Sequence, residues 1–378
     1  MENLTLIATA PFGLESVVKN ELVTLGYKDV LASDGKVTFT GDIESIVHTN
    51  LWLRSADRVL LKIGEFNAFS FEELFEKTKA LPWEEWITQD AKFTVLGKSV
   101  KSKLYSIPDC QSIVKKAIVE KLKQKYHIDW FPETGPEYTV QISILKDVAT
   151  LTIDTSGIGL HKRGYRNEAV EAPPKETLAS ALIQISYWNK KRALYDFFCG
   201  SGTIPIEAAL IGKNIAPGLN RNFACESWPQ IGKEIWKMER TSAFRKINHD
   251  IVLNINASDI NPKAIEIAKE NALEAGVDDC INFEVKDVKK IIIDKPYGIL
   301  ISNPPYGERL GEEKEVAKLY NTLGQIFKNE PTWSTYILTS VEAFESLYGK
   351  KANKRRKLYN GRIKVDYYQY FGQKPKNA

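Results

Sequence analysis

The chain has 378 residues, of which 43% are hydrophobic and 26% charged, and its formal net charge is only +4. This length exceeds that of most single domains, and the composition is that of an ordinary globular protein, so we expect two or three domains. The small net charge does not by itself indicate a nucleic-acid partner, because the clustering of the cations matters more than their sum.

Metal, disulfide and membrane chemistry are not expected from this sequence. The cysteines Cys110, Cys199, Cys225 and Cys280 form no Cys-x-x-Cys pair, and only four histidines are present. No apolar run approaches the roughly 20 residues of a membrane-spanning helix. The N-terminus lacks the basic start and long apolar core of a signal peptide. We therefore expect a cytoplasmic protein without a metal or a membrane partner, and the sequence indicates no oligomeric state.

The first 160 residues divide into two α+β regions, 1–60 and 61–160. In the first region, an apolar face at helical spacing over 14–22 and a turn at 33–35 predict the order strand, helix, strand, strand, helix. We expect this region to be a scaffold without a site of its own. In the second region, strands and helices are expected at 60–66, 71–79, 92–97, 110–125, 138–145 and 148–154.

Lysines gather before the long helix of the second region. Lys98, Lys101 and Lys103 precede Tyr105, whose ring adds a stacking surface. Such a run can follow a phosphate backbone while the ring stacks on a base. A lysine run is more often only a solvated face. Because the helix over 110–125 is also rich in lysine, we favour RNA contact.

A second basic cluster follows at the junction between the two halves of the chain. It comprises Lys162, Arg163, Tyr165 and Arg166. Arginine pairs well with phosphate and tyrosine stacks on bases, so we expect these residues to contact RNA. Farther along the chain, strands and helices alternate in an α/β pattern, and the third expected domain spans 161–378.

A glycine-rich loop opens the catalytic half. The strand over 193–198 leads into Cys199-Gly200-Ser201-Gly202-Thr203, and a helix follows. Glycines let the backbone approach a ligand closely, although tight strand-to-helix turns need glycine in any case. The loop lacks the longer glycine pattern and the lysine of a phosphate cradle. The acidic residue before it, Asp196, suits the cationic end of an amino acid.

Acidic residues end three successive predicted strands. Asp196 is followed by Asp259 and then by Asp287. A carboxylate at the tip of the second strand commonly holds a ribose diol, and Asp287 is placed to accept from an adenine amino group. The separation of Asp196 and Asp259 far exceeds the roughly 20 residues expected, so we interpret 212–250 as an insertion. Each acid alone is more often a helix cap, but three in series favour a ligand site.

The most informative stretch is Asn303-Pro304-Pro305-Tyr306. It follows a short buried strand, which the two prolines must end because neither can donate to a ladder. The motif therefore lies at the carboxyl edge of a strand, where open α/β sheets bind ligands. The amide oxygen of Asn303 and the carbonyl of Pro304 can accept both hydrogens of an exocyclic NH2 group. Tyr306 can stack on the ring that carries this group.

These motifs together resemble the class I S-adenosylmethionine-dependent RNA methyltransferases with N-terminal ferredoxin-like and THUMP domains, and among them the bacterial 23S rRNA guanine-N2 methyltransferases. The resemblance implies an α/β fold with a Rossmann-like, seven-stranded methyltransferase domain at 161–378. It also implies an α+β ferredoxin-like domain at 1–60 and a THUMP RNA-binding domain at 61–160. The hairpin signal Asn360-Gly361 suits an antiparallel end of such a sheet. The stretches that carry the resemblance are 160–166, 175–179, 196–203, 258–262, 302–309 and 358–361.

The resemblance assigns S-adenosylmethionine as the cofactor and RNA, either 23S rRNA or a large-subunit precursor, as the partner. It implies methionine contacts near Thr177, ribose contact at Asp259, adenine contact at Asp287 and the target base at 303–306. Larger bacterial members carry a second methyltransferase module, so the second methylation is not expected here. The full implied cofactor set is Thr177, Asp196, Phe198, Cys199, Gly200, Ser201, Gly202, Thr203, Asp259, Ile260, Asp287 and Asn303.

The expected reaction is methyl transfer to the N2 amine of a guanosine in RNA, and two alternatives stay open. Other amino-group methyltransferases, which modify tRNA guanine-N2, DNA adenine-N6 or protein glutamine-N5, can use a similar loop. The second alternative is a non-catalytic RNA-binding assembly factor that retains cofactor binding.

Overall fold

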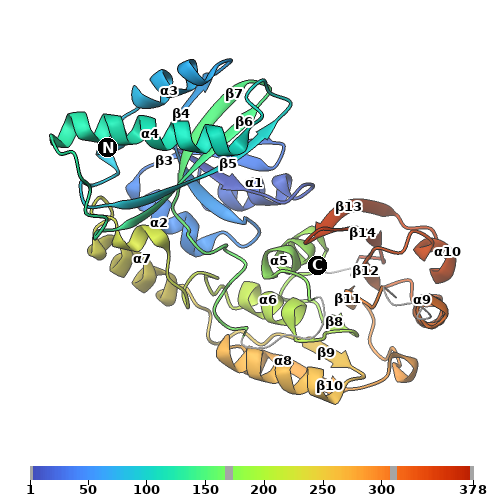
Figure 1. Ribbon diagram of the computed structural model, residues 1–378. Coiled ribbons are helices and arrows are strands. Elements are labelled where there is room, and N and C mark those ends of the chain that lie inside the picture. Colours follow the sequence, from blue (N-terminus) through green and yellow to red (C-terminus); the bar gives the residue numbers. More distant parts are fainter. Residues whose placement is uncertain (1–2, 167–172, 307–312, 375–378) are drawn as a thin grey trace. The chain divides into compact units, whose positions relative to one another are not determined.

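The computed structural model describes residues 3–166, 173–306 and 313–374. The chain forms two units, shown in Figure 1. The first unit comprises Met1–Ala10, Lys19–Leu160 and Asn222–Ser242. The second comprises Pro11–Val18, His161–Arg221 and Ala243–Ala378. Neither unit is therefore one continuous stretch of chain.

A seven-stranded sheet in the order β2-β3-β1-β4-β7-β6-β5 forms the core of the first unit. Strand β4 pairs antiparallel with β1 on one side and with β7 on the other, so the two N-terminal sequence regions share one sheet. The strands are β1 (Leu4–Thr9), β2 (Leu31–Ser33), β3 (Lys36–Gly41), β4 (Arg58–Asn67), β5 (Lys92–Val100), β6 (Glu137–Leu145) and β7 (Val148–Asp154).

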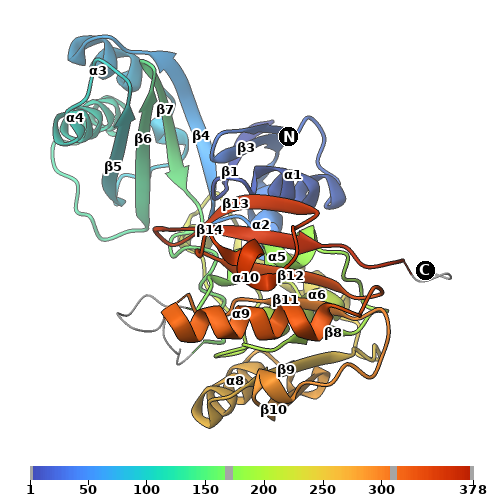
Figure 2. The same ribbon diagram turned by 90° about the vertical axis from the view of Figure 1, so that its right-hand side faces the viewer.

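Helices accompany this sheet in the order that the sequence predicts. Asp42 and Ser70 cap α2 and α3 by accepting hydrogen bonds from backbone N–H groups of the first turn, as such residues commonly do. Figures 1 and 2 show α4 lying across β5 and β6, with α3 beside it. The helices are α1 (Glu15–Thr24), α2 (Ile43–Trp52), α3 (Phe71–Lys79) and α4 (Ile107–Tyr126), with a 3₁₀ turn at Trp83–Glu85.

A second seven-stranded sheet, in the order β10-β9-β8-β11-β12-β14-β13, forms the core of the second unit. In this sheet, the five neighbouring strands β10, β9, β8, β11 and β12 pair in parallel. Strand β14 pairs antiparallel with β12 and β13. This confirms the expected seven-stranded sheet with a terminal hairpin around Asn360 and Gly361. The strands are β8 (Leu194–Asp196), β9 (Ile255–Asp259), β10 (Ile281–Val285), β11 (Ile299–Ser302), β12 (Ser334–Thr339), β13 (Lys354–Asn360) and β14 (Ile363–Tyr370).

Helices cover both faces of this second sheet (Figures 1 and 2). Along β11, Ile299 and Ile301 pack with α5, α6 and α8, while Leu300 packs with α9 and α10. A strand buried on both faces needs a continuous apolar run, which explains why this stretch is so hydrophobic. The helices are α5 (Glu176–Ile185), α6 (Thr203–Gly212), α8 (Pro262–Glu274), α9 (Glu313–Phe327) and α10 (Phe344–Tyr348).

Two helices differ from the sequence expectation. The helix predicted from 175 to about 191 ends at Ile185, where the Ser186 hydroxyl donates to the carbonyl of Ile183 at 2.7 Å. Such a local hydrogen bond competes with continuation of the helix. Helix α9, which the sequence analysis did not predict, packs Tyr320 and Leu323 into the core of the second unit.

A short N-terminal segment completes the core of the second unit. Leu14 and Val17 are buried in the same apolar cluster as Leu178 and Leu182 of α5. Arg356 of β13 donates to the carbonyl of Gly13 at 3.2 Å. The segment 11–18 therefore belongs to the second unit, although the sequence pattern assigned it to the first domain.

The predicted insertion between Asp196 and Asp259 supplies a segment to the first unit. It carries α7 (Lys233–Arg245) and a 3₁₀ turn at Ala224–Ser227. Trp228 stacks on Tyr138, with ring centroids 4.6 Å apart, and donates from Nε1 to the carbonyl of Glu137 at 3.2 Å. The segment 222–242 thus packs against β6 of the first unit.

Within residues 3–166, 173–306 and 313–374, none of the helices combines the length and the apolar character that crossing a bilayer requires.

The Trp228 contact predicts a large effect on stability. We expect Trp228→Ala to lower the free energy of unfolding by about 3–5 kcal/mol, because it removes a fully buried indole and its hydrogen bond. Urea unfolding followed by far-UV circular dichroism measures this change. The matched control is Trp130→Ala, which removes an indole that is 84% exposed and should change stability by about 0.5 kcal/mol or less.

Candidate active site

Polar residues gather where the parallel strands of the second sheet end. Asp196 and Asp259 are the last residues of β8 and β9, and Asp287 follows β10 by two residues. Asn303 comes directly after β11. Strands β9 and β10 lie on one side of β8, and β11 and β12 on the other. At such a reversal of strand order, the carboxyl ends of the strands leave a crevice that binds ligands.

The glycine-rich loop needs glycine at two positions. Gly200 and Gly202 have φ values of 51° and 84°, in the left-handed region that L side chains rarely adopt. A Cβ on Gly202 would also lie 3.1 Å from the Cβ of Ala268 in α8. These two glycines let the chain turn from β8 into α6, whose first residue is Thr203. The loop thus brings backbone N–H groups and a helix N-terminus to the crevice.

A serine links the ends of β8 and β11. The Ser302 hydroxyl donates to Asp196 Oδ1 at 2.6 Å and accepts from the backbone N–H of Phe197 at 3.1 Å. The N–H of Phe198 also donates to Asp196 Oδ1. Ser302 is not among the site residues that the sequence motifs predict. The available signal was a polar residue at the last position of an otherwise apolar strand.

Burial dominates the electrostatics of Asp196, whose side chain is almost fully inaccessible. It raises the pKa of this carboxyl to about 7; the Ser302 and Phe198 hydrogen bonds oppose the rise, and the charge of Asp259 adds to it. A carboxyl with this pKa changes its charge near neutral pH. A cationic ligand group beside Asp196 would therefore favour its ionised form.

Asp259 and Asp287 organise the two neighbouring loops. Asp259 Oδ2 accepts from the N–H of Gly200 at 3.0 Å, and its Oδ1 accepts from the N–H of Asn261 at 2.9 Å. Asp287 accepts from the N–H of Lys289 and caps a 3₁₀ turn at Val288–Lys290. These contacts bring the glycine loop next to the tip of β9. The ribose and adenine contacts stay predictions, as does that of Ile260, whose side chain is exposed.

The Asn303-Pro304-Pro305-Tyr306 loop is held by its own tyrosine and by α9. The Tyr306 hydroxyl donates to Asn303 Oδ1. The Tyr320 hydroxyl donates to the carbonyl of Pro305 at 2.8 Å and is also hydrogen-bonded to Thr339 Oγ1. These anchors were not predicted from the sequence, because α9 was not predicted. Residues 307–309 of the quoted motif lie outside the described residues.

The remaining predicted cofactor residues surround the start of α5 and α6. The hydroxyls of Thr177 and Ser201 are buried and form no hydrogen bond within the described part of the chain. The Cys199 thiol is buried, and burial raises its pKa well above its usual value. Phe198 is half-buried beside it. The buried hydroxyls fit a polar ligand group, whereas the thiol stays protonated and is not suited to nucleophilic chemistry.

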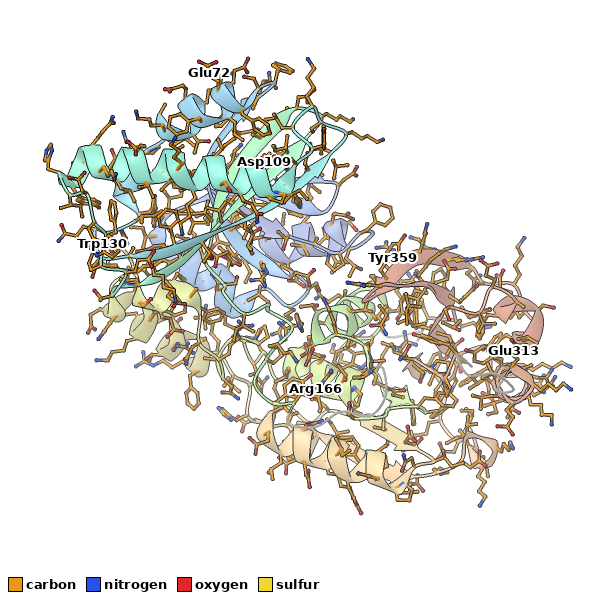
Figure 3. The ribbon with its side chains drawn as sticks, in the orientation of Figure 1. Glu72, Asp109, Trp130, Arg166, Glu313 and Tyr359 are labelled. Carbon is orange, nitrogen blue, oxygen red and sulfur yellow. The ribbon has the colours of Figure 1, made fainter. Side chains whose placement is uncertain are left out.

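The junction cluster divides into buried and exposed members. Arg163 pairs with Glu207 of α6, with 3.3 Å between Nε and Oε1, and the Tyr165 hydroxyl donates to the same oxygen. The side chains of Arg163 and Tyr165 are both buried, and Arg163 is the counter-ion that the buried Glu207 requires. Because buried side chains are not exposed to a macromolecule, we keep neither Arg163 nor Tyr165 in the RNA-contact proposal. Arg166 lies beside α6 and contacts Thr203 (Figure 3). Lys162 is exposed.

The lysines of the first unit remain available to a ligand. Lys98, Lys101 and Lys103 are exposed on and after β5, and Tyr105 is 83% exposed. The Lys103 ammonium lies 5.1 Å from the centroid of the Phe69 ring, which is itself exposed. A metal site is not apparent: within the described ranges, no group of three or more His, Cys, Asp or Glu residues could hold an ion.

Comparison with family models shows which protein family the chain belongs to. The family described as "RMKL-like, methyltransferase domain" matches residues 163–369, which is more than half of the sequence. The chain belongs to this methyltransferase family. The "RlmL ferredoxin-like domain" family matches residues 5–60, and the THUMP domain family matches residues 68–154.

Relatives of this methyltransferase match along its whole length. "Putative RNA methyltransferase YpsC" of Bacillus subtilis (strain 168) is 55% identical over 375 residues, which cover 99% of this chain and 97% of the relative. The crystal structure of SMU.472 complexed with SAH is 47% identical, covers 100% of both chains and superposes with a TM-score of 0.93. A predicted N6-adenine-specific DNA methylase from Listeria monocytogenes str. 4b F2365 is 53% identical, covers 99% of this chain and 97% of its own, and has a TM-score of 0.94.

The raised pKa of Asp196 predicts pH-dependent cofactor binding. Only the ionised carboxylate attracts an ammonium group, so we expect S-adenosylhomocysteine to bind about ten-fold more weakly at pH 6 than at pH 8. Isothermal titration calorimetry at both pH values measures this ratio.

Asp196→Asn serves as the control and should bind the ligand weakly with little pH dependence. A wild-type affinity that is equal at both pH values would contradict the assignment of Asp196 to the ammonium group.

The same shift affects folding, because the unfolded carboxyl ionises near pH 3.8 and the folded one near pH 7. The contribution of Asp196 to the free energy of unfolding is therefore fully present below pH 3.8, falls as the pH rises from there, and is lost once the pH has risen through 7.

Proposed function

We propose that the protein transfers a methyl group from S-adenosylmethionine to the exocyclic N2 amine of a guanosine in RNA, in 23S rRNA or a large-subunit precursor. The observation that carries this proposal is the Asn303-Pro304-Pro305-Tyr306 loop at the end of β11. Its neighbour Ser302 bonds to Asp196, and Gly200 of the cofactor loop bonds to Asp259. The proposed base site and the proposed cofactor site are thus joined by direct hydrogen bonds.

The loop can hold an amine through two acceptors and a ring. Asn303 Oδ1 accepts from the Tyr306 hydroxyl, which orients the carboxamide, and a carbonyl oxygen has a second lone pair for the amine. The Pro304 carbonyl would accept the other amine hydrogen. Tyr306 would stack on the purine after the nucleotide leaves its helix.

Positioning then supplies much of the rate. The guanine N2 is conjugated with its ring and is weakly nucleophilic, so two acceptors that fix its hydrogens also direct its lone pair. S-adenosylmethionine supplies an electrophilic sulfonium methyl group. Tyr320 holds the carbonyl of Pro305 and so keeps the loop in place for an in-line approach. The reaction requires neither a metal nor a covalent enzyme intermediate.

RNA is the favoured substrate because exposed cations occur in both units. The first unit presents Lys98, Lys101 and Lys103 beside exposed aromatic rings. In the second unit, Lys162 is exposed. The name of the Bacillus subtilis relative, which includes RNA methyltransferase, supports the same substrate class.

The main rival is another amino-group methyltransferase. The description of the Listeria monocytogenes relative names N6-adenine of DNA, and adenine N6 is also a conjugated exocyclic amine that this loop could hold. Protein glutamine-N5 and tRNA guanine-N2 are further candidates, as is a non-catalytic assembly factor. Mass spectrometry of nucleosides from rRNA, tRNA and DNA of a deletion strain separates them. Loss of N2-methylguanosine from 23S rRNA alone supports the proposal, and an unchanged rRNA profile contradicts it.

Asn303→Ala should reduce methyl transfer by at least about 100-fold, because it removes one of the two acceptors that orient the amine. Transfer of radiolabel from S-adenosylmethionine to 23S rRNA measures the rate. Calorimetry with S-adenosylhomocysteine should show little loss of cofactor affinity. Tyr306→Phe is the matched control: it keeps the ring, loses the hydroxyl that bonds to Asn303 and should retain more activity. Full activity of Asn303→Ala would refute the proposed role.

The lysine cluster predicts a charge-dependent RNA affinity. The double variant Lys101→Glu/Lys103→Glu should weaken binding of purified 23S rRNA, and the slope of log affinity against log salt should fall by roughly 1 to 2. Filter binding over a range of salt concentrations measures both quantities. The double variant Lys19→Glu/Lys28→Glu makes the same charge change at exposed lysines elsewhere in the first unit. Equal losses in both variants would indicate only a general effect of net charge.

A further inference from the structure

Arg166 contacts the beginnings of two helices at once. Its Nη2 donates to Oγ1 of Thr203, the first residue of α6, at 2.6 Å, and to the carbonyl of Pro174 at 3.2 Å. Its Nε lies 3.3 Å from Oε1 of Glu176, the first residue of α5. Only 15% of the arginine side chain is exposed. The guanidinium is therefore held beside the glycine-rich loop, within the second unit.

The charges around Arg166 are mostly positive, which favours binding of an anion. A helix N-terminus carries a partial positive charge, which disfavours a cation unless negative charge balances it. Here two N-termini converge on Arg166, and Lys175, the N-cap residue of α5, adds further positive charge. Glu176 pairs with Arg166 but supplies only one negative charge against Arg166, Lys175 and the two helix N-termini. The other buried acid nearby, Glu207, is already paired with Arg163.

Two buried hydroxyls independently indicate a ligand here. Thr177 Oγ1 in the first turn of α5 and Ser201 Oγ in the glycine-rich loop lack a hydrogen-bond partner within the described residues. Both side chains are at least 98% buried. Leaving such groups unpaired is costly, and an anionic ligand would accept from them.

We propose that Arg166 binds the α-carboxylate of the cofactor's methionine end, with the hydroxyl of Thr177 as a second donor, and thereby selects cofactors that carry this carboxylate. Asp196, at the end of β8 before the glycine-rich loop, then holds the ammonium group. The zwitterionic end of the ligand meets one residue of opposite charge for each of its groups. Arg166 thus acts on the cofactor and not on RNA, which revises the role that the sequence predicted for it. This inference depends on the cofactor alone and not on the identity of the RNA.

The test compares two ligands that differ only in this carboxylate. Titration calorimetry of Arg166→Gln with S-adenosylhomocysteine should show affinity reduced by roughly 10- to 100-fold, the range for a lost charged hydrogen bond. The decarboxylated analogue, which keeps the amine, should bind the variant and the wild type equally. Arg166→Lys should recover part of the affinity for S-adenosylhomocysteine. Lys190→Gln, which removes an exposed cation elsewhere in the second unit, should change neither affinity.

Each other role of Arg166 gives a different result. A purely structural ion pair with Glu176 would weaken both ligands alike and lower the melting temperature, which overturns the proposal. An RNA contact would leave S-adenosylhomocysteine binding unchanged and weaken rRNA binding, which also overturns it. If Arg166→Gln does not fold, the wild type decides: it must prefer S-adenosylhomocysteine to the decarboxylated analogue by at least about ten-fold. A wild type that binds neither ligand would instead remove the cofactor assignment itself.

Discussion

The hydrogen bond from Ser302 to Asp196 is the contact on which the proposed chemistry depends. It joins the end of β8, where the cofactor loop starts, to the end of β11, where the base-binding loop starts. Because the serine also accepts from the backbone of Phe197, the two strand ends are locked together by a buried side chain. The same bond limits how far burial raises the pKa of Asp196, and so keeps that carboxyl able to change its charge near neutral pH.

Around this contact, the site is assembled from hydrogen bonds that each join one loop to the next. Gly200 donates to Asp259, and Tyr320 of α9 donates to Pro305. These bonds come from elements on both faces of the second sheet. A loop with two consecutive prolines has few backbone donors of its own, so a hydrogen bond from a tyrosine outside the loop helps to hold it in place. Tyr320 of α9, which lies outside the motif, therefore supports the Asn303-Pro304-Pro305-Tyr306 loop.

Local patterns were sufficient to predict most strands, the glycine-rich turn and the terminal hairpin, because each follows from periodicity or from a backbone requirement. They were insufficient for Arg163 and Tyr165, which the sequence placed at an RNA surface. Their burial depends on Glu207, which lies in a different helix and is itself buried, so only the three-dimensional packing reveals the pair. Ser302 and Tyr320 were missed for the same reason, since their roles arise from partners distant in sequence. Local patterns also do not show that 11–18 packs into the second unit and 222–242 into the first, because this depends on tertiary packing.

Each unit is built from segments that are separated in the sequence, and this has a consequence for biosynthesis. The first unit contains Asn222–Ser242, and its Tyr138 packs on Trp228 from that segment. A ribosome adds residues from the N-terminus onward, and domains usually fold as they emerge. Here the N-terminal unit cannot reach its final packing when its own sheet has been synthesised. It must wait until the chain has passed the glycine-rich loop and α6, so completion of the N-terminal unit is tied to translation of the first part of the catalytic one.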